Sequence, residues 1–169
     1  LPAFKRLEAP LTEEELENLE DELLTKGCRQ PFLTWNNYLL MNFDAFEFCK
    51  KHNIACQIRK KRYPSQEVVI SEICKMHLKL TDCSDIMRKY LIGSRFYVEK
   101  ELAKAQPHEY DSQYNYDDSA MKTRMRLARE FNVSGQTIYK YGIHADTLNR
   151  IADLSESLFL KIMRQELKV

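Results

Sequence analysis

The side chains best suited to recognition chemistry lie between positions 124 and 143, in the stretch RMRLAREFNVSGQTIYKYGI. Gln136 carries an amide that can pair bidentately with adenine, and Tyr139 and Lys140 follow it at helical spacing. Hydrogen-bonding groups on one face of a helix are what the reading of base edges in a major groove requires. The alternative for each position is a solvent-exposed helix residue. The DNA-contacting set that we expect comprises Ser134, Gly135, Gln136, Thr137, Tyr139 and Lys140.

Basic residues accompany this stretch, because residues 119–143 hold five lysines and arginines against one glutamate. We expect Lys122, Arg124 and Arg126 to contact DNA phosphates, with Arg124 facing outward. The competing interpretation is that they are solubilising surface charges. The first 22 residues, with two basic and eight acidic side chains, carry a net charge of −6, so the remainder carries +7. A basic body is compatible with an anionic partner.

The elements that must position these side chains are two helices that cross at a steep angle, a helix-turn-helix. Leu127 and Phe131 predict the buried face of the first helix, and Ala128 is small where the second helix crosses it. Asn132 can adopt the left-handed conformation that the turn demands. An ordinary helical hairpin in a helical core is the alternative. The residues expected to bury the turn, cap the second helix and pack it back are Val133, Ser134, Ile138 and Tyr141.

Cysteine and histidine indicate neither a metal site nor a disulfide framework. The five cysteines are odd in number, no two have a two-residue spacing, and the four histidines form no ligand-like group. We expect reduced, buried or half-buried thiols in a cytosolic protein. For Cys28, between Gly27 and Arg29, the alternative is a reactive thiol. We predict no catalytic residue, no metal and no cofactor.

The first 64 residues predict a small α+β unit. Thr12 and Glu15 form a capping-box pattern at a helix start, and Gly27 is a helix-ending signal. Asn36 and Asn37 suit a tight hairpin turn because asparagine tolerates positive φ. The expected elements are a helix, two strands, a short helix and a third strand, over 12–26, 31–35, 38–41, 43–53 and 54–59.

From residue 65 the pattern is helical. The acidic stretch QPHEYDSQYNYDDS lacks periodicity and predicts an exposed loop. No apolar run reaches the ~18–20 residues of a membrane helix, and the first residues lack a secretory signal and a starting methionine, so we expect a piece of a longer, non-membrane protein. The expected segments are a helix capped by Ser65, a longer helix from about Asp82 to Ala105 capped by Thr81, a loop over 106–119, three or four short helices from Ala120, and a last helix from about Ser155.

The sequence resembles the ParB-type partition and transcription-regulator family, in particular the ParB-like proteins of plasmids, phages and integrative elements. The resemblance covers most of the chain and is carried by the order and spacing of four segments. It implies an α+β fold: a ParB/sulfiredoxin-like domain over 1–64, then an all-helical domain over 65–169 that contains the helix-turn-helix. The four segments are LTEEELENLEDELLTKGCRQPFLTW at 11–35, KLTDCSDIMRKYLIGSRF at 79–96, LAREFNVSGQTIYKY at 127–141 and LFLKIMRQELKV at 158–169.

The chain departs from this family in the loop after the hairpin. Relatives use a glycine, two variable residues and an arginine there to hold nucleotide phosphates. In this chain Asn42 replaces the glycine and Ala45 replaces the arginine, so neither the bare backbone nor the cation is present. Asp44 would repel a triphosphate, and the phenylalanines that follow predict a packed segment over 42–48. Sulfiredoxins place a catalytic cysteine in this loop, which is missing here. We expect no CTP binding and no nuclease or sulfiredoxin activity.

These observations predict a non-enzymatic, sequence-specific DNA-binding protein, acting in partition, maintenance or transcriptional regulation of a plasmid, phage or integrative element. The partners that the resemblance implies are double-stranded DNA, a second copy of the chain, and a partition ATPase or another mobile-element protein. Its location would be the cytoplasm, with the nucleoid or plasmid. One alternative is a protein-interaction adaptor that has lost DNA contact. A residual nucleotide-handling enzyme is another, against which the missing glycine and arginine argue.

Overall fold

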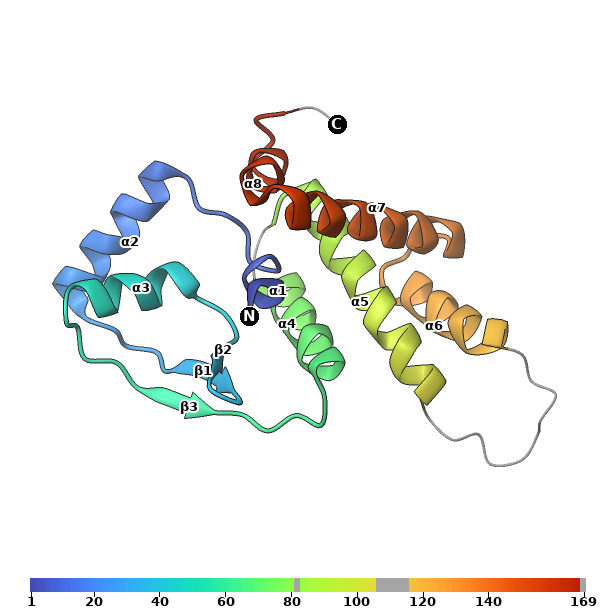
Figure 1. The fold of residues 1–169 in the computed structure, drawn as a ribbon, viewed down its shortest axis with the longest axis horizontal. Coiled ribbons are helices and arrows are strands. Elements are labelled where there is room, and N and C mark those ends of the chain that lie inside the picture. The colour runs from blue at the N-terminus through green and yellow to red at the C-terminus, as the bar shows by residue number, and fades with distance from the viewer. Residues whose placement is uncertain (81–82, 106–115, 168–169) are drawn as a thin grey trace. The chain divides into compact units, whose positions relative to one another are not determined.

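The computed structural model describes residues 1–80, 83–105 and 116–167, and the chain divides into two compact units, Leu1–Pro64 and Ser65–Val169. Among the described residues, all the strands lie in the first unit, and the second unit is built from helices (Figure 1). The predicted mixed α+β class is therefore confirmed.

The first unit begins with α1 (Pro2–Lys5) and α2 (Glu13–Lys26). The predicted capping box is present: the Glu15 N–H donates to Thr12 Oγ1 at 3.2 Å, and the Thr12 N–H donates to the Glu15 carboxylate at 2.8 Å. Gly27 ends α2 with a φ of 69°, a conformation that glycine adopts without steric cost. Residues at the two ends of α2 therefore determine where this helix starts and where it stops.

A small sheet with strand order β2-β1-β3 follows. Its strands are β1 (Phe32–Trp35), β2 (Tyr38–Leu39) and β3 (Ile58–Lys60). The first two pair antiparallel across Asn36 and Asn37, whose φ angles of 47° and 65° confirm the predicted tight turn. Because β1 and β3 are parallel, the chain between them crosses over, and it does so through α3 (Phe43–Lys51).

The third strand is shorter than predicted, starting at Ile58 and not at Ile54. The Ile54 N–H donates to the Cys49 carbonyl at 2.8 Å, which closes the C-terminus of α3. The Ile54 side chain packs against the core of this unit, so Ile54 contributes to this core and not to the sheet. The β1 partners of β3 are Phe32 to Thr34 only, which limits the strand to three residues.

The second unit is built from helices whose starts differ in part from those predicted. The long second helix begins at Asp85, and Ser84 Oγ accepts a hydrogen bond from the Met87 N–H at 3.3 Å. Thr81 and Asp82 lie outside the described residues. The helices are α4 (Gln66–Leu80), α5 (Asp85–Ala105), α6 (Tyr116–Glu130), α7 (Gly135–Leu154) and α8 (Glu156–Met163).

Two further expectations for this unit need correction. Residues 116–119, predicted as loop, belong to α6, while 106–115 lie outside the described part of the chain. The prediction of short helices from Ala120 is wrong for α7, which runs for 20 residues. Its buried positions recur over its whole length, and packing along such a face stabilises a long helix.

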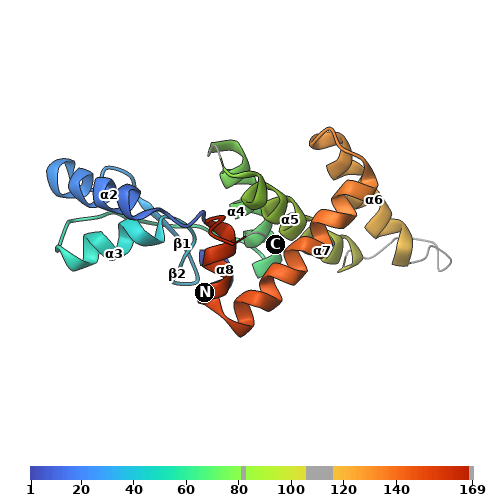
Figure 2. The ribbon, with the colours of Figure 1, turned by 90° about the horizontal axis from the view of Figure 1, so that it is seen from above.

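Helices α5 and α7 cross at very close range, and a glycine on each permits the approach (Figures 1 and 2). A Cβ atom at Gly93 of α5 would lie 2.0 Å from the backbone oxygen of Tyr141. A Cβ atom at Gly142 of α7 would lie 2.9 Å from the Phe96 ring. Any larger residue at Gly93 would force the helices apart, whereas one at Gly142 would have to displace the Phe96 ring.

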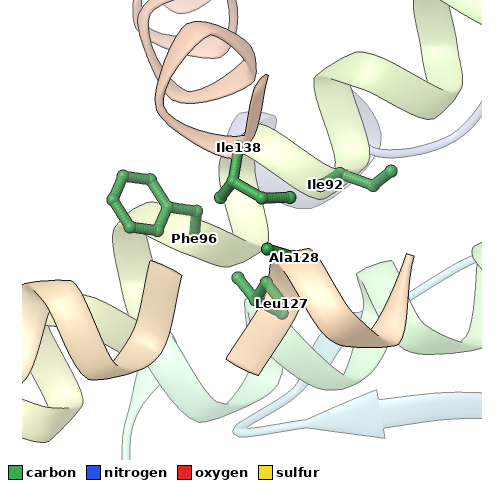
Figure 3. Close-up of a cluster of buried hydrophobic side chains, with 5 residues drawn as sticks. All are labelled: Ile92, Phe96, Leu127, Ala128 and Ile138. Atoms are coloured by element: carbon green, nitrogen blue, oxygen red, sulfur yellow. The ribbon is translucent and has the colours of Figure 1, made fainter. Parts of the chain in front are cut away.

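The core beneath α6 and α7 is formed by side chains from three helices (Figure 3). Figure 3 shows Ile138 of α7 directed toward Leu127 and Ala128 of α6, with Phe96 and Ile92 of α5 on either side. Leu127 and Ile138 are fully buried, as their predicted packing roles require. This core holds the two helices of the predicted motif at a fixed angle.

Candidate nucleic-acid interface

The turn between α6 and α7 contains the left-handed asparagine and the serine cap that the sequence predicted. Asn132 adopts the left-handed conformation with a φ of 54°. The Val133 N–H donates to the Ala128 carbonyl at 2.9 Å, which closes the end of α6. Ser134 caps α7 by accepting a hydrogen bond from the Thr137 N–H at 3.1 Å, and its hydroxyl lies 2.9 Å from Thr137 Oγ1. The hydroxyls of Ser134 and Thr137 are therefore engaged at the helix start.

Helix α7 carries opposite faces of different character. Ile138, Ala145 and Leu148 are buried against the rest of the unit. Gln136 and Lys140 are exposed on the outward side, and the Tyr139 side chain beside them is 47% exposed. The predicted base-reading residues are thus brought together on one solvent-facing surface.

Gly135 is half-buried beneath side chains of α6, unlike its exposed neighbour Gln136. A Cβ atom at this glycine would lie 3.0 Å from Met125 Sδ and 3.6 Å from Arg124 Nε. The missing side chain leaves room for these two residues at the first turn of α7. Gly135 therefore makes space for its neighbours in addition to any direct contact with DNA.

The expectation that Arg124 faces outward is wrong for part of its side chain. Arg124 is half-buried, and its Nε has no hydrogen-bond partner within the described part of the chain. The cause is the space above Gly135, into which the arginine fits. Its cation accordingly lies near the N-terminus of α7, where the helix dipole is also positive, an arrangement that an anion would stabilise.

Arg126 is held in an ion network that sequence reasoning did not find. It pairs with the Glu99 carboxylate and lies 3.5 Å from that of Glu130. Buried Arg95 binds Glu130 with two hydrogen bonds, of 2.5 and 2.9 Å, and donates to Glu99 at 2.7 Å. This network joins α5 to the last turn of α6, next to the turn of the motif.

Glu99 is the centre of the network. Burial opposes its ionisation, but hydrogen bonds from Ser71, at 2.6 Å, and from Arg95 outweigh that effect, so the pKa of the Glu99 carboxyl lies below its usual value. The available signal was the i,i+4 pair of Arg95 and Glu99 within an apolar helical stretch. Nothing in the local sequence indicated that Arg126 would join it.

The outer face of α6 carries a hollow of about 420 Å³ with apolar and cationic lining. Met121 and Met125 supply the apolar side chains, and they are 51% and 41% exposed. The exposed cations are Lys122 and Arg126, both predicted, and Arg129, which sequence reasoning had not assigned to the site. Lys122 and Arg129 add positive charge to this face of α6, whereas the charge of Arg126 is already compensated by Glu99 and Glu130.

The segment over 42–48 is packed, as predicted. Ala45, Phe46 and Phe48 pack against the buried side chains of the first unit, and the Phe46 and Phe32 ring centroids lie 5.1 Å apart. The N-terminus of α3 is occupied by a carboxylate of the chain itself: the N–H groups of Asn42 and Phe43 donate to Glu8 at 2.9 and 3.1 Å.

The carboxylate of Glu8 therefore occupies the backbone donors at the start of α3, which are the groups that could bind an external anion. Burial raises the pKa of Glu8, and the two backbone hydrogen bonds only partly offset this. Asn42 adopts a left-handed conformation with a φ of 61°, which helps to aim its N–H. The anion-binding end of α3 is thus already filled.

Within the described ranges, no three histidine, cysteine, aspartate or glutamate side chains come together as metal ligands. None of the five cysteines forms a disulfide; Cys49 and Cys74 are buried and Cys28 and Cys83 half-buried as expected, but Cys56 is exposed, contrary to expectation. Among the described helices, none has the length and apolar character that crossing a membrane requires.

Comparison with protein-family models, with curated proteins and with solved structures found no match to this chain.

Proposed function

We propose that the chain is a sequence-specific, non-enzymatic DNA-binding protein of ParB-like type. The observation that carries the proposal is the outward face of α7, with Gln136, Tyr139 and Lys140 on a helix whose start is capped by Ser134. Gln136 would read a base edge in the major groove, and Tyr139 and Lys140 would contact bases or the backbone. Arg124 and the α7 N-terminus would bind one phosphate, and Lys122 and Arg129 would bind others along α6.

The biological setting is proposed from the resemblance. The first unit would be a degenerate ParB/sulfiredoxin-like domain, used for assembly or partner contact without nucleotide hydrolysis. The chain would act as a homodimer on inverted-repeat DNA, in partition, maintenance or transcription of a plasmid, phage or integrative element, with a partition ATPase or another protein of that element as partner. Its place would be the cytoplasm, on nucleoid or plasmid DNA.

The test begins with a duplex selected by the protein from a random library. Gln136→Ala should cost about 1–3 kcal/mol on this duplex and little on random DNA, because the amide reads sequence. Lys140→Ala should weaken both duplexes and reduce the salt-dependence slope by up to about one unit, because it removes one cation. Lys140 is a better charge probe than Arg124, whose half-burial would add a structural effect.

Lys161→Ala provides the matched control, since it removes the same charge from an exposed position on α8. It should change neither the affinity nor the slope. Titrations at several salt concentrations give both quantities, and circular dichroism checks that each variant is folded. If Gln136→Ala binds the selected duplex with unchanged preference, the assignment of α7 to the groove is wrong.

A protein-interaction adaptor is the second candidate, and the hollow on α6 favours it. Met121 and Met125 present flexible apolar side chains of the kind that adaptable protein interfaces use. An absence of binding to any duplex at low salt, where phosphate contacts are strongest, would support the adaptor over the DNA-binding protein.

A further inference from the structure

Ile143 is an aliphatic side chain on the outward face of α7, and it is 47% exposed. Because an α-helix has 3.6 residues per turn, Gln136, Lys140 and Ile143 lie on the same side of α7, opposite buried Ala145. Single exposed aliphatic residues are common on protein surfaces, but Ile143 lies one helical turn from Tyr139 and Lys140, two of the proposed DNA contacts. Ile143 therefore belongs to the same outward face as the proposed DNA contacts.

Three polar side chains on the C-terminal side of Ile143 are already engaged with other groups of α7. The Thr147 hydroxyl donates to the Ile143 carbonyl at 2.9 Å and is used within the helix. Asp146 and Arg150 pair with each other at 3.2 Å, so their charges largely cancel. This end of the face is therefore suited to an apolar contact, whereas the Gln136 end is suited to hydrogen bonding.

We propose that Ile143 contacts the 5-methyl group of a thymine in the major groove, about three base pairs from the base that Gln136 reads. Thymine alone presents an apolar group on its major-groove edge, and a side chain without donors or acceptors can distinguish bases only through that group. Seven residues of helix advance about 10 Å, and each base pair advances about 3.4 Å, so a helix axis that runs along the duplex axis gives this spacing. The inference rests on the proposed function.

The experiment replaces each thymine of the selected duplex in turn by uracil, which lacks only the methyl group. For the full chain, one replacement should weaken binding about fourfold, the value of one buried methyl group. In Ile143→Ala the same replacement should have no effect, while other replacements act as before. Gln136→Ala locates the base read by Gln136 through single base-pair changes, so the distance between the two positions can be counted.

Leu158→Ala is the matched control, because it truncates an exposed aliphatic side chain on α8. It should keep the uracil effect in full. If the selected duplex depends on Gln136 but no uracil effect disappears in Ile143→Ala, the inference is wrong and the proposed function stands. If no selective duplex is obtained, both are wrong. If sedimentation shows that Ile143→Ala separates a dimer without removing a uracil effect, Ile143 belongs to a contact between copies and the inference is overturned.

Discussion

At the scale of single residues, the cations near the motif divide by what already holds them. Arg126 is paired with Glu99, so a phosphate would have to compete with a carboxylate for its guanidinium. Arg124 is half-buried over Gly135, while Lys140 is exposed on α7. A cation that is already paired with a carboxylate is less available to a DNA phosphate. Lys140 is therefore expected to contribute more salt-dependent affinity for DNA than Arg126.

The thiols provide a residue-scale prediction on reactivity. Cys56 is exposed, whereas burial, with a smaller contribution from neighbouring Cys28, raises the pKa of Cys49 to about 11. The thiolate is the reactive form, so at pH 8 only about one Cys49 in a thousand would be ionised. We expect iodoacetamide at pH 8 to label Cys56 rapidly in the folded protein and to leave Cys49 unmodified, as measured by peptide mass spectrometry.

Urea provides the control, because unfolding should let both residues react alike. Raising the pH toward 10 should increase Cys49 labelling, since its thiolate fraction rises as the pH approaches its pKa. Cys28 is half-buried and its Sγ donates to the Gln30 carbonyl at 3.3 Å, which favours a packing role. Rapid labelling of Cys28 in the folded protein would instead support the reactive-thiol alternative.

At the scale of elements, the crossing of α5 and α7 determines where the proposed reading face lies. Gly93 lets the α7 backbone approach α5, Gly142 leaves room for the Phe96 ring, and Arg95 holds α6 through Glu130. Closely packed helices move as a unit, because interiors resist even small changes in volume. The orientation of Gln136 is therefore set by residues that lie outside the proposed reading face.

Gly93→Ala tests this crossing. The added Cβ atom would lie 2.0 Å from a backbone oxygen, so the helices must separate. We expect the free energy of unfolding to fall by about 3 kcal/mol, because overpacking outweighs the ~1 kcal/mol gain in helix propensity. Urea denaturation followed by circular dichroism measures the change.

Gly135→Ala is the matched glycine control. The atom nearest to its added Cβ is the flexible end of Met125, at 3.0 Å, which can move aside. Its effect should stay within about 1 kcal/mol. Equal destabilisation by the two variants would show that the close approach of α5 and α7 does not limit the size of the residue at position 93.

At the scale of the whole molecule, the small net charge of +1 hides an uneven distribution. Eight of the 25 acidic residues lie within residues 1–22, in and before α2, but the ten cations of the first unit balance its ten acidic residues, and the second unit carries the net charge of +1. The first unit has also filled its own anion-binding helix end with Glu8. The two units therefore differ in where their charges are placed and not in their net charge.

We predict that the chain binds no CTP with micromolar affinity. Glu8 occupies the backbone donors of α3, Asp44 adds repulsion, and no arginine stands at Ala45. Titration calorimetry with CTP and Mg²⁺ should give no binding heat, and thermal unfolding with millimolar CTP should show no upward shift. The selected duplex serves as the positive control for the thermal measurement. Micromolar binding by calorimetry would contradict the prediction.

The sequence by itself determined the features that depend on a few neighbouring residues. Thr12 with Glu15, the Asn36-Asn37 turn, Asn132 and Ser134 all act through backbone groups at most four positions away, so their roles could be predicted. The periodic apolar residues of the motif, such as Leu127 and Ile138, likewise indicated which faces would be buried.

Only the tertiary structure decided the pairings between distant positions. Glu8 reaches Asn42 across 34 residues and Arg126 reaches Glu99 across 27, and Gly93 meets Tyr141 where two helices cross. Local sequence patterns do not indicate such partners, because a charged or small residue has the same local conformational preferences whichever distant residue it contacts. Those contacts determine which cations remain available to a phosphate and where the proposed reading face lies. Neither can be predicted before the packing of the helices is known.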